Sequence, residues 1–178
     1  KPAGRHSANR APRRTLCSFH RMTTSTSPSV DRDWRANLVE DDAGIRRILD
    51  RTRRIAVLGI KTAETGQPAF YVPQYAQKAG YTIVPVPVYF PDVTEILGEP
   101  VFRTLASIPG PVDLVDVFRR PKDIDAHVDD ILTKHPAAVW FQLGIRNDAA
   151  AERLARAGIE VVQDRCLLVE VRKLRAES

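Results

Sequence analysis

Hydrophobic positions along residues 41–174 follow two periods that alternate. Short continuous apolar runs, the pattern of strands buried on both faces, lie at residues 54–59, 81–88, 112–118, 137–143 and 159–163. Apolar residues spaced three and four apart predict helices at residues 41–53, 67–79, 121–134, 147–157 and 166–174. In the last segment Val169 and Val171 leave a strand open as an alternative.

Residue types at the ends of three of these segments support the helices. Asp41 and Asn147 are good N-cap residues, and Pro68 suits the first turn of a helix. Gly80 and Gly158 fit the position just after a helix, where a left-handed backbone is common.

The second apolar run ends in two prolines, Pro85 and Pro87, which cannot donate to a strand ladder. We therefore expect this strand to pair normally only as far as about Val84. Residues 89–111 read as an irregular crossover with a turn of helix near residues 93–97.

Strands and helices that alternate in this way predict right-handed crossovers and a parallel sheet with helices on both faces. The expected fold class is α/β, a three-layer sandwich around five mostly parallel strands. We expect the strand order 3-2-1-4-5, with a ligand crevice beyond the carboxyl ends of the strands.

Composition narrows the class of protein. The chain has 178 residues, of which 43% are hydrophobic and 28% charged, which excludes a fully disordered chain. Cys17 and Cys166 are too far apart to suggest a disulfide framework or a zinc site, which fits a reducing compartment and predicts a cytoplasmic protein. No apolar run approaches the roughly 20 residues of a spanning helix, so we expect no membrane partner.

The net charge of +5 comes from the N-terminal segment. Residues 1–21 hold six of the 27 basic residues and no acidic one, which leaves 21 basic against 22 acidic residues in the rest of the chain. The body is therefore near neutral, and we expect no nucleic-acid partner.

Residues 1–30 predict a disordered basic leader, and residues 31–178 a single domain. Upstream sequence before a natural start at Met22 is the favoured interpretation of the leader. An organelle transit peptide, which would change the compartment, and a nucleic-acid-binding arm are the alternatives.

The residues after the first strand suit a phosphate group. Gly59 removes a side chain, Ile60 follows it, and Lys61 adds a cation ahead of a helix N-terminus. Free backbone amides and the helix dipole would attract an anion at this point. The alternative is a glycine that serves only the turn.

The dinucleotide fingerprint is absent from this loop. Glycines would be needed where Lys61 and Glu64 stand, and no acidic residue follows the second strand to hold a ribose. Val86 and Pro87 instead offer a flat apolar platform for adenine, or the prolines merely end the strand.

Polar residues follow the remaining strands as well. Arg119 and Arg120 come directly after the third strand, where they could bind phosphate or form a solvated charge run. Gln142 follows the fourth strand and could hydrogen-bond a ligand, while Gly144 permits close approach. Cys166 follows the fifth strand, where a buried apolar role is commoner than an activated thiol.

These segments occur in an order that resembles the small stand-alone CoA-binding proteins, which are similar to the N-terminal domain of the succinyl-CoA synthetase alpha subunit. The resemblance covers residues 50–174. Its segments are IAVLG at 55–59, GYTIVPV at 80–86, ILGE at 96–99, VDLVDVFRRP at 112–121, WFQLGI at 140–145 and DRC at 164–166.

The resemblance implies a Rossmann-like fold that binds coenzyme A across the strand ends. Carried over by position, Gly59, Ile60 and Lys61 would face the pyrophosphate, and Val86 and Pro87 the adenosine. Phe118, Arg119 and Arg120 would line the crevice. Gln142, Leu143, Gly144 and Ile145 would lie towards the pantetheine. Two positions differ from the family pattern: Lys61 replaces a common Ser, and Pro85-Val86-Pro87-Val88 replaces Pro-Val-Asn-Pro.

The leading hypothesis is a module that binds coenzyme A or an acyl-CoA as a small-molecule ligand, without chemistry of its own. His127 and His135 fall on or after a helix, away from the strand ends, and no catalytic residue can be assigned. The alternative is an enzyme or redox module that uses NADP or another nucleotide. A regulatory role in a complex, as a homodimer or with a partner protein, also stays open.

Overall fold

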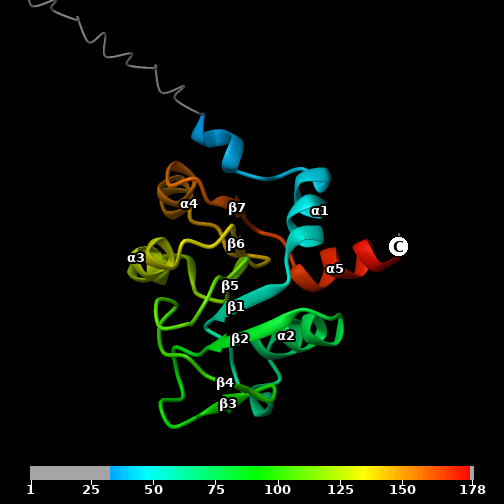
Figure 1. The fold of residues 1–178 in the computed structure, drawn as a ribbon, viewed down its shortest axis with the longest axis vertical. Coiled ribbons are helices and arrows are strands. Elements are labelled where there is room, and N and C mark those ends of the chain that lie inside the picture. The colour runs from blue at the N-terminus through cyan, green and yellow to red at the C-terminus, as the bar shows by residue number, and fades with distance from the viewer. Residues whose placement is uncertain (1–32, 177–178) are drawn as a thin grey trace, which may run out of the picture. The chain divides into compact units, whose positions relative to one another are not determined.

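Five parallel strands form the central sheet of this computed structural model, which describes residues 33–176 (Figure 1). The strands are β1 (Arg54–Leu58), β2 (Thr82–Val86), β5 (Leu114–Val117), β6 (Ala138–Phe141) and β7 (Glu160–Val162). Their order is β2-β1-β5-β6-β7, with every neighbouring pair parallel. The expected α/β class and five-stranded sheet are confirmed, while the predicted leader lies outside the described residues.

Helices cover both faces of the sheet, as Figure 1 shows. One face carries α1 (Asp42–Arg51), α2 (Pro68–Lys78) and α5 (Leu167–Ala176), and the other carries α3 (Asp125–Lys134) and α4 (Asp148–Arg156). Short 3-10 turns lie at η1 (Trp34–Asn37), η2 (Ala63–Thr65) and η3 (Pro121–Asp123). The C-terminal segment is the helix α5, which decides between the two alternatives for that stretch.

Successive residues along a strand lie alternately in two hydrophobic layers, one on each face of the sheet. On β1, Ile55 and Val57 pack towards α1, α2 and α5, whereas Ala56 and Leu58 pack towards α3 and α4. Both layers are closed to water, so both sets of alternating positions must be apolar. This explains why the strands read as continuous apolar runs in the sequence.

The helix-end signals are confirmed. Asp41 Oδ1 accepts a hydrogen bond from the Gly44 amide at 2.7 Å, and Asn147 Oδ1 accepts one from the Ala150 amide at 3.0 Å. Pro68 is the first residue of α2. Each of these side chains meets the demand of its helix end, because first-turn amides have no partner within the helix.

The predicted strand order was wrong. β5, the third long strand, lies beside β1 on the side away from β2. The place outside β2 is taken by the crossover, where the Phe102 amide donates to the Pro85 carbonyl at 2.9 Å. With that edge occupied, the third strand can join the sheet only across β1.

The helical turn predicted near residues 93–97 was also wrong. The crossover instead forms a small antiparallel pair, β3 (Glu95–Ile96) and β4 (Glu99–Pro100). Leu97 and Gly98 join the two strands with φ angles of 59° and 75°. Two successive positive φ values are what a tight two-residue hairpin needs.

Pro85 does not end the pairing of β2 at Val84, contrary to expectation. β2 pairs with β1 through Val86, which lies opposite Leu58. The carbonyl of Pro85 points to the outer edge, towards Phe102. The proline nitrogen shares that outward side, so its missing N–H removes nothing from the ladder with β1.

Backbone from outside the sheet also covers the opposite edge. Leu38 pairs in parallel with Val161 on β7, and the Val39 amide donates to the Val161 carbonyl at 2.9 Å. An uncovered edge strand would expose unpaired amides and carbonyls. The outer strands β2 and β7 thus both have a partner beyond the five-stranded sheet.

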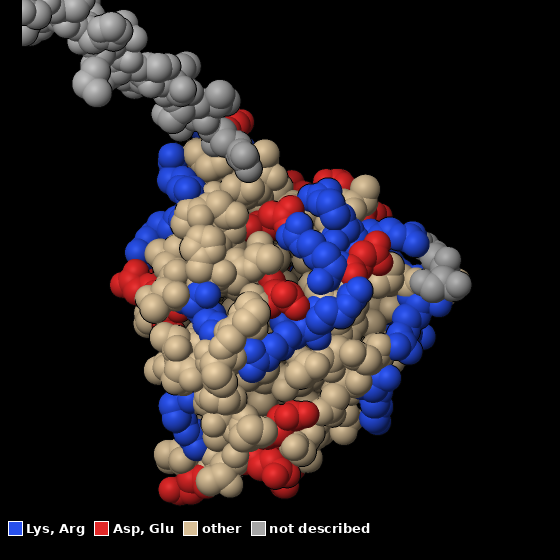
Figure 2. Space-filling model, in the orientation of Figure 1, with Lys and Arg blue, Asp and Glu red and all other residues tan. Residues whose placement is uncertain are grey.

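Charges of both signs are interspersed on the face seen in Figure 2. This agrees with the near-neutral charge expected for the body of the protein. Within residues 33–176, no helix is long and apolar enough to cross a membrane.

Candidate functional site

The strand order places a switch point at β1. The chain leaves β1 towards β2 on one side and later returns to β5 on the other side. Ligands of open α/β sheets bind in the crevice outside the carboxyl ends of the strands at such a point. The residues after β1 and after β5 therefore border the expected ligand crevice.

Gly59 follows β1 at the point where the loop after β5 approaches most closely. Its φ is +86°, and a Cβ atom placed on it would lie 2.5 Å from the Phe118 carbonyl oxygen. The Phe118 amide also donates to the Leu58 carbonyl at 2.9 Å. Glycine is required here both for the left-handed backbone and for the contact between the two strand ends.

A cavity of about 500 Å³, hereafter the groove, opens beside this contact. It lies between the first turns of α2 and the loops that follow β1, β5, β6 and β7. Eight of the predicted site residues line it: Lys61, Phe118, Arg119, Arg120, Gln142, Leu143, Gly144 and Ile145. Selecting the residues that follow strand ends therefore predicted most of one wall of the groove.

Sequence reasoning missed the α2 side of the groove. The additional lining residues are Gln67, Pro68, Ala69, Tyr71, Val72, Pro121 and Cys166. The α2 residues had a usable signal, because they belong to the helix that the Gly59 loop feeds. Cys166 had been noted after the fifth strand, but it is half-buried on the groove wall.

Three predicted site residues lie elsewhere. Ile60 and Val86 are each 1% exposed and belong to the hydrophobic layers. Pro87 lines a second cavity of about 480 Å³, together with Leu58 and Val88 at the ends of β1 and β2. The second cavity borders Leu58 at the carboxyl end of β1, and the groove borders Lys61 in the loop that follows.

His127 of α3 also lines the second cavity. The expectation that this histidine lies away from the strand ends was therefore wrong. Partial burial lowers the pKa of His127 below its usual value, and the positive charge of Arg119 adds to the effect. Both effects favour the neutral imidazole.

Two amides of the loop after β1, where the sequence predicts free amides, already have backbone partners. The Gly59 amide donates to the Val86 carbonyl at 2.8 Å, and the Lys61 amide donates to the Ala69 carbonyl at 3.2 Å. Ala69 has a free carbonyl because Pro73, four residues on in α2, has no N–H to give it. A proline inside the helix thus ties the loop to α2.

Positive potential reaches the groove from other sources. The N-cap residue of α2, Gln67, makes no side-chain bond to the helix end, so the partial positive charge of that end is not offset by a cap. Lys61 lies nearby, and its Nζ donates to Gln67 Oε1 at 2.5 Å. Both features favour an anion at this end of the groove.

The two arginines after β5 differ sharply. The Arg119 side chain is 11% exposed, and its buried Nε has no hydrogen-bond partner within the described part of the chain. Its guanidinium lies 5.4 Å from the centre of the Tyr89 ring and 3.7 Å from Asp123 Oδ2. The Arg120 side chain is 67% exposed, and its Nε donates to the same carboxylate at 2.6 Å.

Asp123 interacts more strongly with Arg120 than with Arg119. The hydrogen bond from Arg120 holds the pKa of Asp123 below its usual value. Arg119 is only the weaker, longer partner of that carboxylate. Arg119 is therefore a nearly buried cation of the groove with capacity left for a ligand.

Gln142 presents an amide that is fixed from behind. It is 4% exposed, its Nε2 donates to Asp116 Oδ1 at 2.7 Å, and its Oε1 accepts from the Leu167 amide at 3.3 Å. Each end of the amide therefore has one inner partner. One N–H and one lone pair remain for the groove.

Asp116 is fully buried beneath Gln142 on β5. Burial raises its pKa to about 7, although the hydrogen bond from Gln142 opposes the rise. Its Oδ2 has no hydrogen-bond partner in residues 33–176.

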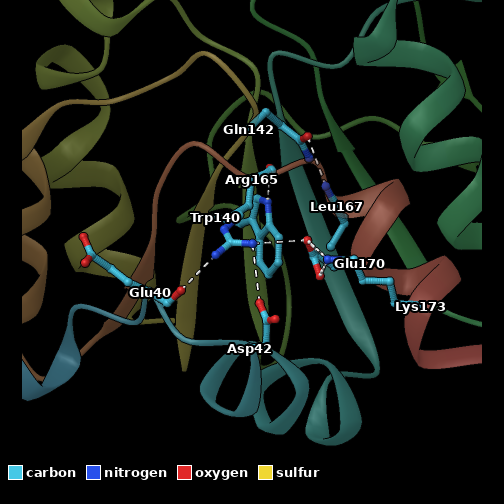
Figure 3. A network of polar contacts seen from close by, with 8 residues as sticks. All are labelled: Glu40, Asp42, Trp140, Gln142, Arg165, Leu167, Glu170 and Lys173. Atoms are coloured by element: carbon cyan, nitrogen blue, oxygen red, sulfur yellow. Dashed lines mark hydrogen bonds and ion pairs between the residues drawn. The ribbon is translucent and has the colours of Figure 1, made fainter. Parts of the chain in front are cut away.

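A polar network holds α5 against the end of β6, as Figure 3 shows. Trp140 Nε1 donates to the Arg165 carbonyl at 2.7 Å, and the Arg165 guanidinium donates to the Glu40 carbonyl at 3.0 Å. Arg165 also lies 3.7 Å from the buried Glu170, which accepts from Lys173 at 3.1 Å. The network fixes where α5 begins, and with it Cys166.

The arrangement suits binding of an extended ligand with an anionic part. Cations and an uncapped helix end lie on one side of the groove, and apolar side chains with one fixed amide line the rest. Within the described ranges, no group of three His, Cys, Asp or Glu residues could hold a metal ion.

Similarity to known proteins shows the family of this chain. The CoA binding domain family matches residues 53–172. The Bacillus subtilis (strain 168) protein YneT, described as uncharacterized, is 35% identical over 127 residues, which cover 71% of this chain and 91% of YneT.

Solved structures share the fold. A Thermus thermophilus protein known as cell-free ID.343 has a TM-score of 0.69 and 39% identity, covering 76% of this chain and 99% of that one. The Ca. Korarchaeum cryptofilum dinucleotide-forming acetyl-coenzyme A synthetase 1 has a TM-score of 0.51 and 14% identity, covering 61% of this chain and 25% of that one, a likeness of fold alone. The family match spans well over half of the described residues, and the chain belongs to the CoA-binding domain family.

Proposed function

We propose that this protein binds coenzyme A or an acyl-CoA in the groove, with no reaction of its own. Membership of the CoA-binding domain family supports coenzyme A as the ligand in general terms. The lining and charge of the groove support this position in the chain and the orientation of the ligand.

Arg119 is the observation that carries the proposal. It is a nearly buried cation at the switch point of the sheet, and its Nε has no partner in the part of the chain described. Buried polar groups are normally hydrogen-bonded, so an unpaired guanidinium nitrogen favours a ligand oxygen beside it. A pyrophosphate matches the forked donors of arginine and the positive end of α2.

The rest of the groove suits pantetheine. Its amides each offer a donor and an acceptor, which complement the spare N–H and lone pair of Gln142. Tyr71, Leu143 and Ile145 add apolar lining for the methylene chain. Leu143 is 69% exposed, so ligand binding would remove a large apolar side chain from water.

The second cavity suits the adenosine part. Pro87 and Val88 line it at the end of β2, where residues 84–88 contain no acidic side chain. The acidic residue that does line it, Asp130, accepts hydrogen bonds from the Leu105 and Ala106 amides, which offset its charge. In this arrangement the ligand crosses from one cavity to the other beside Arg119.

Isothermal titration with coenzyme A, acetyl-CoA, NADH and NADPH tests the proposal. We expect micromolar or tighter binding of coenzyme A and acetyl-CoA, and much weaker binding of both nicotinamide nucleotides. Micromolar NADPH with only millimolar coenzyme A would instead support the nucleotide-dependent enzyme. Release of free thiol from acetyl-CoA by the purified protein would contradict the absence of a reaction.

Arg119→Ala and Arg120→Ala form a matched pair for the same titration. Loss of Arg119 should weaken coenzyme A binding by about 1.5–3 kcal/mol, because a charged hydrogen bond is lost in a nearly buried place. Loss of Arg120 should weaken binding much less, because its guanidinium is exposed and paired with Asp123. Equal effects of the two variants would contradict the assignment of Arg119.

A further inference from the structure

The carboxyl group of Asp116 lies behind the groove wall with half of its hydrogen-bonding capacity unused. Its Oδ1 accepts from Gln142 Nε2 at 2.7 Å, while its buried Oδ2 has no partner among the described residues. Buried polar atoms without a partner are uncommon in folded proteins and call for an explanation. The charge of the carboxyl group decides how costly this unpaired oxygen is.

A neutral carboxylic acid fits this position better than a carboxylate. Full burial raises the pKa of Asp116 to about 7, against the hydrogen bonds at Gln142 and Val117, which lower it. A buried carboxylate would carry a charge on Oδ2 with no cation beside it, and such a charge is far more costly than a neutral oxygen.

The surrounding elements supply no opposing charge to Asp116. The titratable groups on them include Lys61 after β1, Tyr75 of α2, Arg119 after β5, Asp42 of α1, and Cys166, Glu170 and Lys173 at α5. Lys61 bonds Gln67, Arg119 pairs with Asp123, and Glu170 pairs with Lys173. The causes that shift the pKa of Asp116 are burial, Gln142 and Val117.

Gln142 transmits the state of Asp116 to the groove. While the acid is neutral, one N–H of Gln142, a residue that lines the groove, bonds Oδ1, and the other N–H has no partner among the described residues. An ionised carboxylate would turn the amide until the bonded N–H is shared between Oδ1 and Oδ2, because Gln142 Nε2 is the donor beside the carboxyl group. Turning the amide in this way would also strain the 3.3 Å bond from the Leu167 amide, which lies next to Cys166.

We propose that Asp116 is a positioning residue for the groove: as a neutral acid it holds the amide of Gln142 in the orientation that a ligand meets, and its ionisation weakens ligand binding. The effect on binding rests on the proposed function, whereas the effect on Gln142 does not. The two parts can therefore be tested separately.

The first test uses the wild-type protein without ligand. The side-chain NH₂ resonances of Gln142 are followed by ¹⁵N NMR from about pH 5 to about pH 9. We expect them to shift in a single titration with a midpoint near 7, the value set by Asp116. Resonances that stay unmoved through this range would overturn the proposal, whatever ligand the protein binds.

The second test is titration with coenzyme A at about pH 6 and about pH 8. If only the neutral form binds, wild-type affinity should fall about tenfold more over this interval than the affinity of Asp116→Asn, which stays neutral. Asp129→Asn is the matched control, because Asp129 is an exposed carboxylate on α3, paired with Arg153. That variant should keep the wild-type difference.

Ionisation of the ligand itself is common to all three proteins and cancels in the comparison. A wild-type difference that persists in Asp116→Asn would overturn the role of Asp116 in binding. No binding of coenzyme A by the wild type at either pH would contradict the proposed function, and the ligand-free titration would still decide whether Asp116 positions Gln142. Because that titration uses the wild type, it gives its result even if Asp116→Asn does not fold.

Discussion

At the scale of single residues, Gly59 and Gly158 share a backbone conformation but have different surroundings. Their φ angles are +86° and +84°. A Cβ on Gly59 would meet the Phe118 carbonyl, whereas a Cβ on Gly158 would meet nothing within 4 Å. The pair therefore separates the cost of a left-handed backbone from the cost of keeping two strand ends in contact.

Gly158→Ala should lower the free energy of unfolding by roughly 1–2 kcal/mol, the cost of the left-handed conformation alone. Gly59→Ala should lower it further, because the overlap with Phe118 must also be relieved, and it should weaken coenzyme A binding. Urea unfolding and isothermal titration measure the two effects. Gly59→Ala with the stability and affinity of Gly158→Ala would show that the contact has no importance.

The raised pKa of Asp116 predicts how the free energy of unfolding changes with pH. Its pKa is about 7 in the folded protein against a usual value of 3.8. Between these values the unfolded chain has lost a proton that the folded protein keeps, so rising pH removes stability, by up to about 1.4 kcal/mol per pH unit. Well above pH 7 both the folded and the unfolded protein have released this proton, so Asp116 no longer makes the free energy of unfolding depend on pH.

Asp116→Asn should therefore gain stability relative to the wild type as the pH rises from about 4 to about 7. Urea unfolding across this range measures the difference between the two proteins. A difference that does not change with pH would mean that Asp116 ionises at its usual value.

At the scale of elements, two helices that point their N-termini at the strand-end face are capped differently. Asn147 accepts from the Ala150 amide and holds α4, whereas Gln67 makes no such bond at α2. An unoccupied cap leaves the positive end of α2 available to the groove. Without a side-chain cap, α2 is less stable at the end that borders the proposed ligand.

Asn147→Ala should lower the free energy of unfolding by about 0.5–2 kcal/mol, the usual cost of losing a cap. Gln67→Ala should have a smaller effect on stability, since it removes only the exposed bond to Lys61. Thermal and urea unfolding of both variants compare them. An equal loss in Gln67→Ala would show that Gln67 caps α2 in solution.

Helices and strands were predictable from the sequence because each has its own period and end signals, as at Asp41 and Gly158. The order of the strands was not, because right-handed crossovers allow β5 on either side of β1. The deciding contact is the bond between Phe102 and Pro85 in the crossover, and no period marks it. The same limit applies to the groove: residues after strands were found, but the bond from Lys61 to Ala69 depends on Pro73 in a different element.

At the scale of the molecule, charge and fold are carried by different parts of the chain. The buried hydrophobic residues of the described region begin at Val39, while residues 1–21 hold six basic residues and no acidic one. A protein that starts at Met22 should keep the stability and the coenzyme A affinity of the full chain while its net charge changes from +5 to −1. Urea unfolding and isothermal titration check this, and a weaker affinity in the shorter protein would assign the leader a part in binding.

The coverage of β2 and β7 bears on how copies of the protein can meet. Phe102 and Val39 occupy acceptors that a strand from a second copy would use to extend the sheet. Growth by strand addition, which leads to swapped dimers and fibrils, is disfavoured at those positions. A second copy that extended the sheet would first have to displace the Phe102 amide from Pro85 or the Val39 amide from Val161.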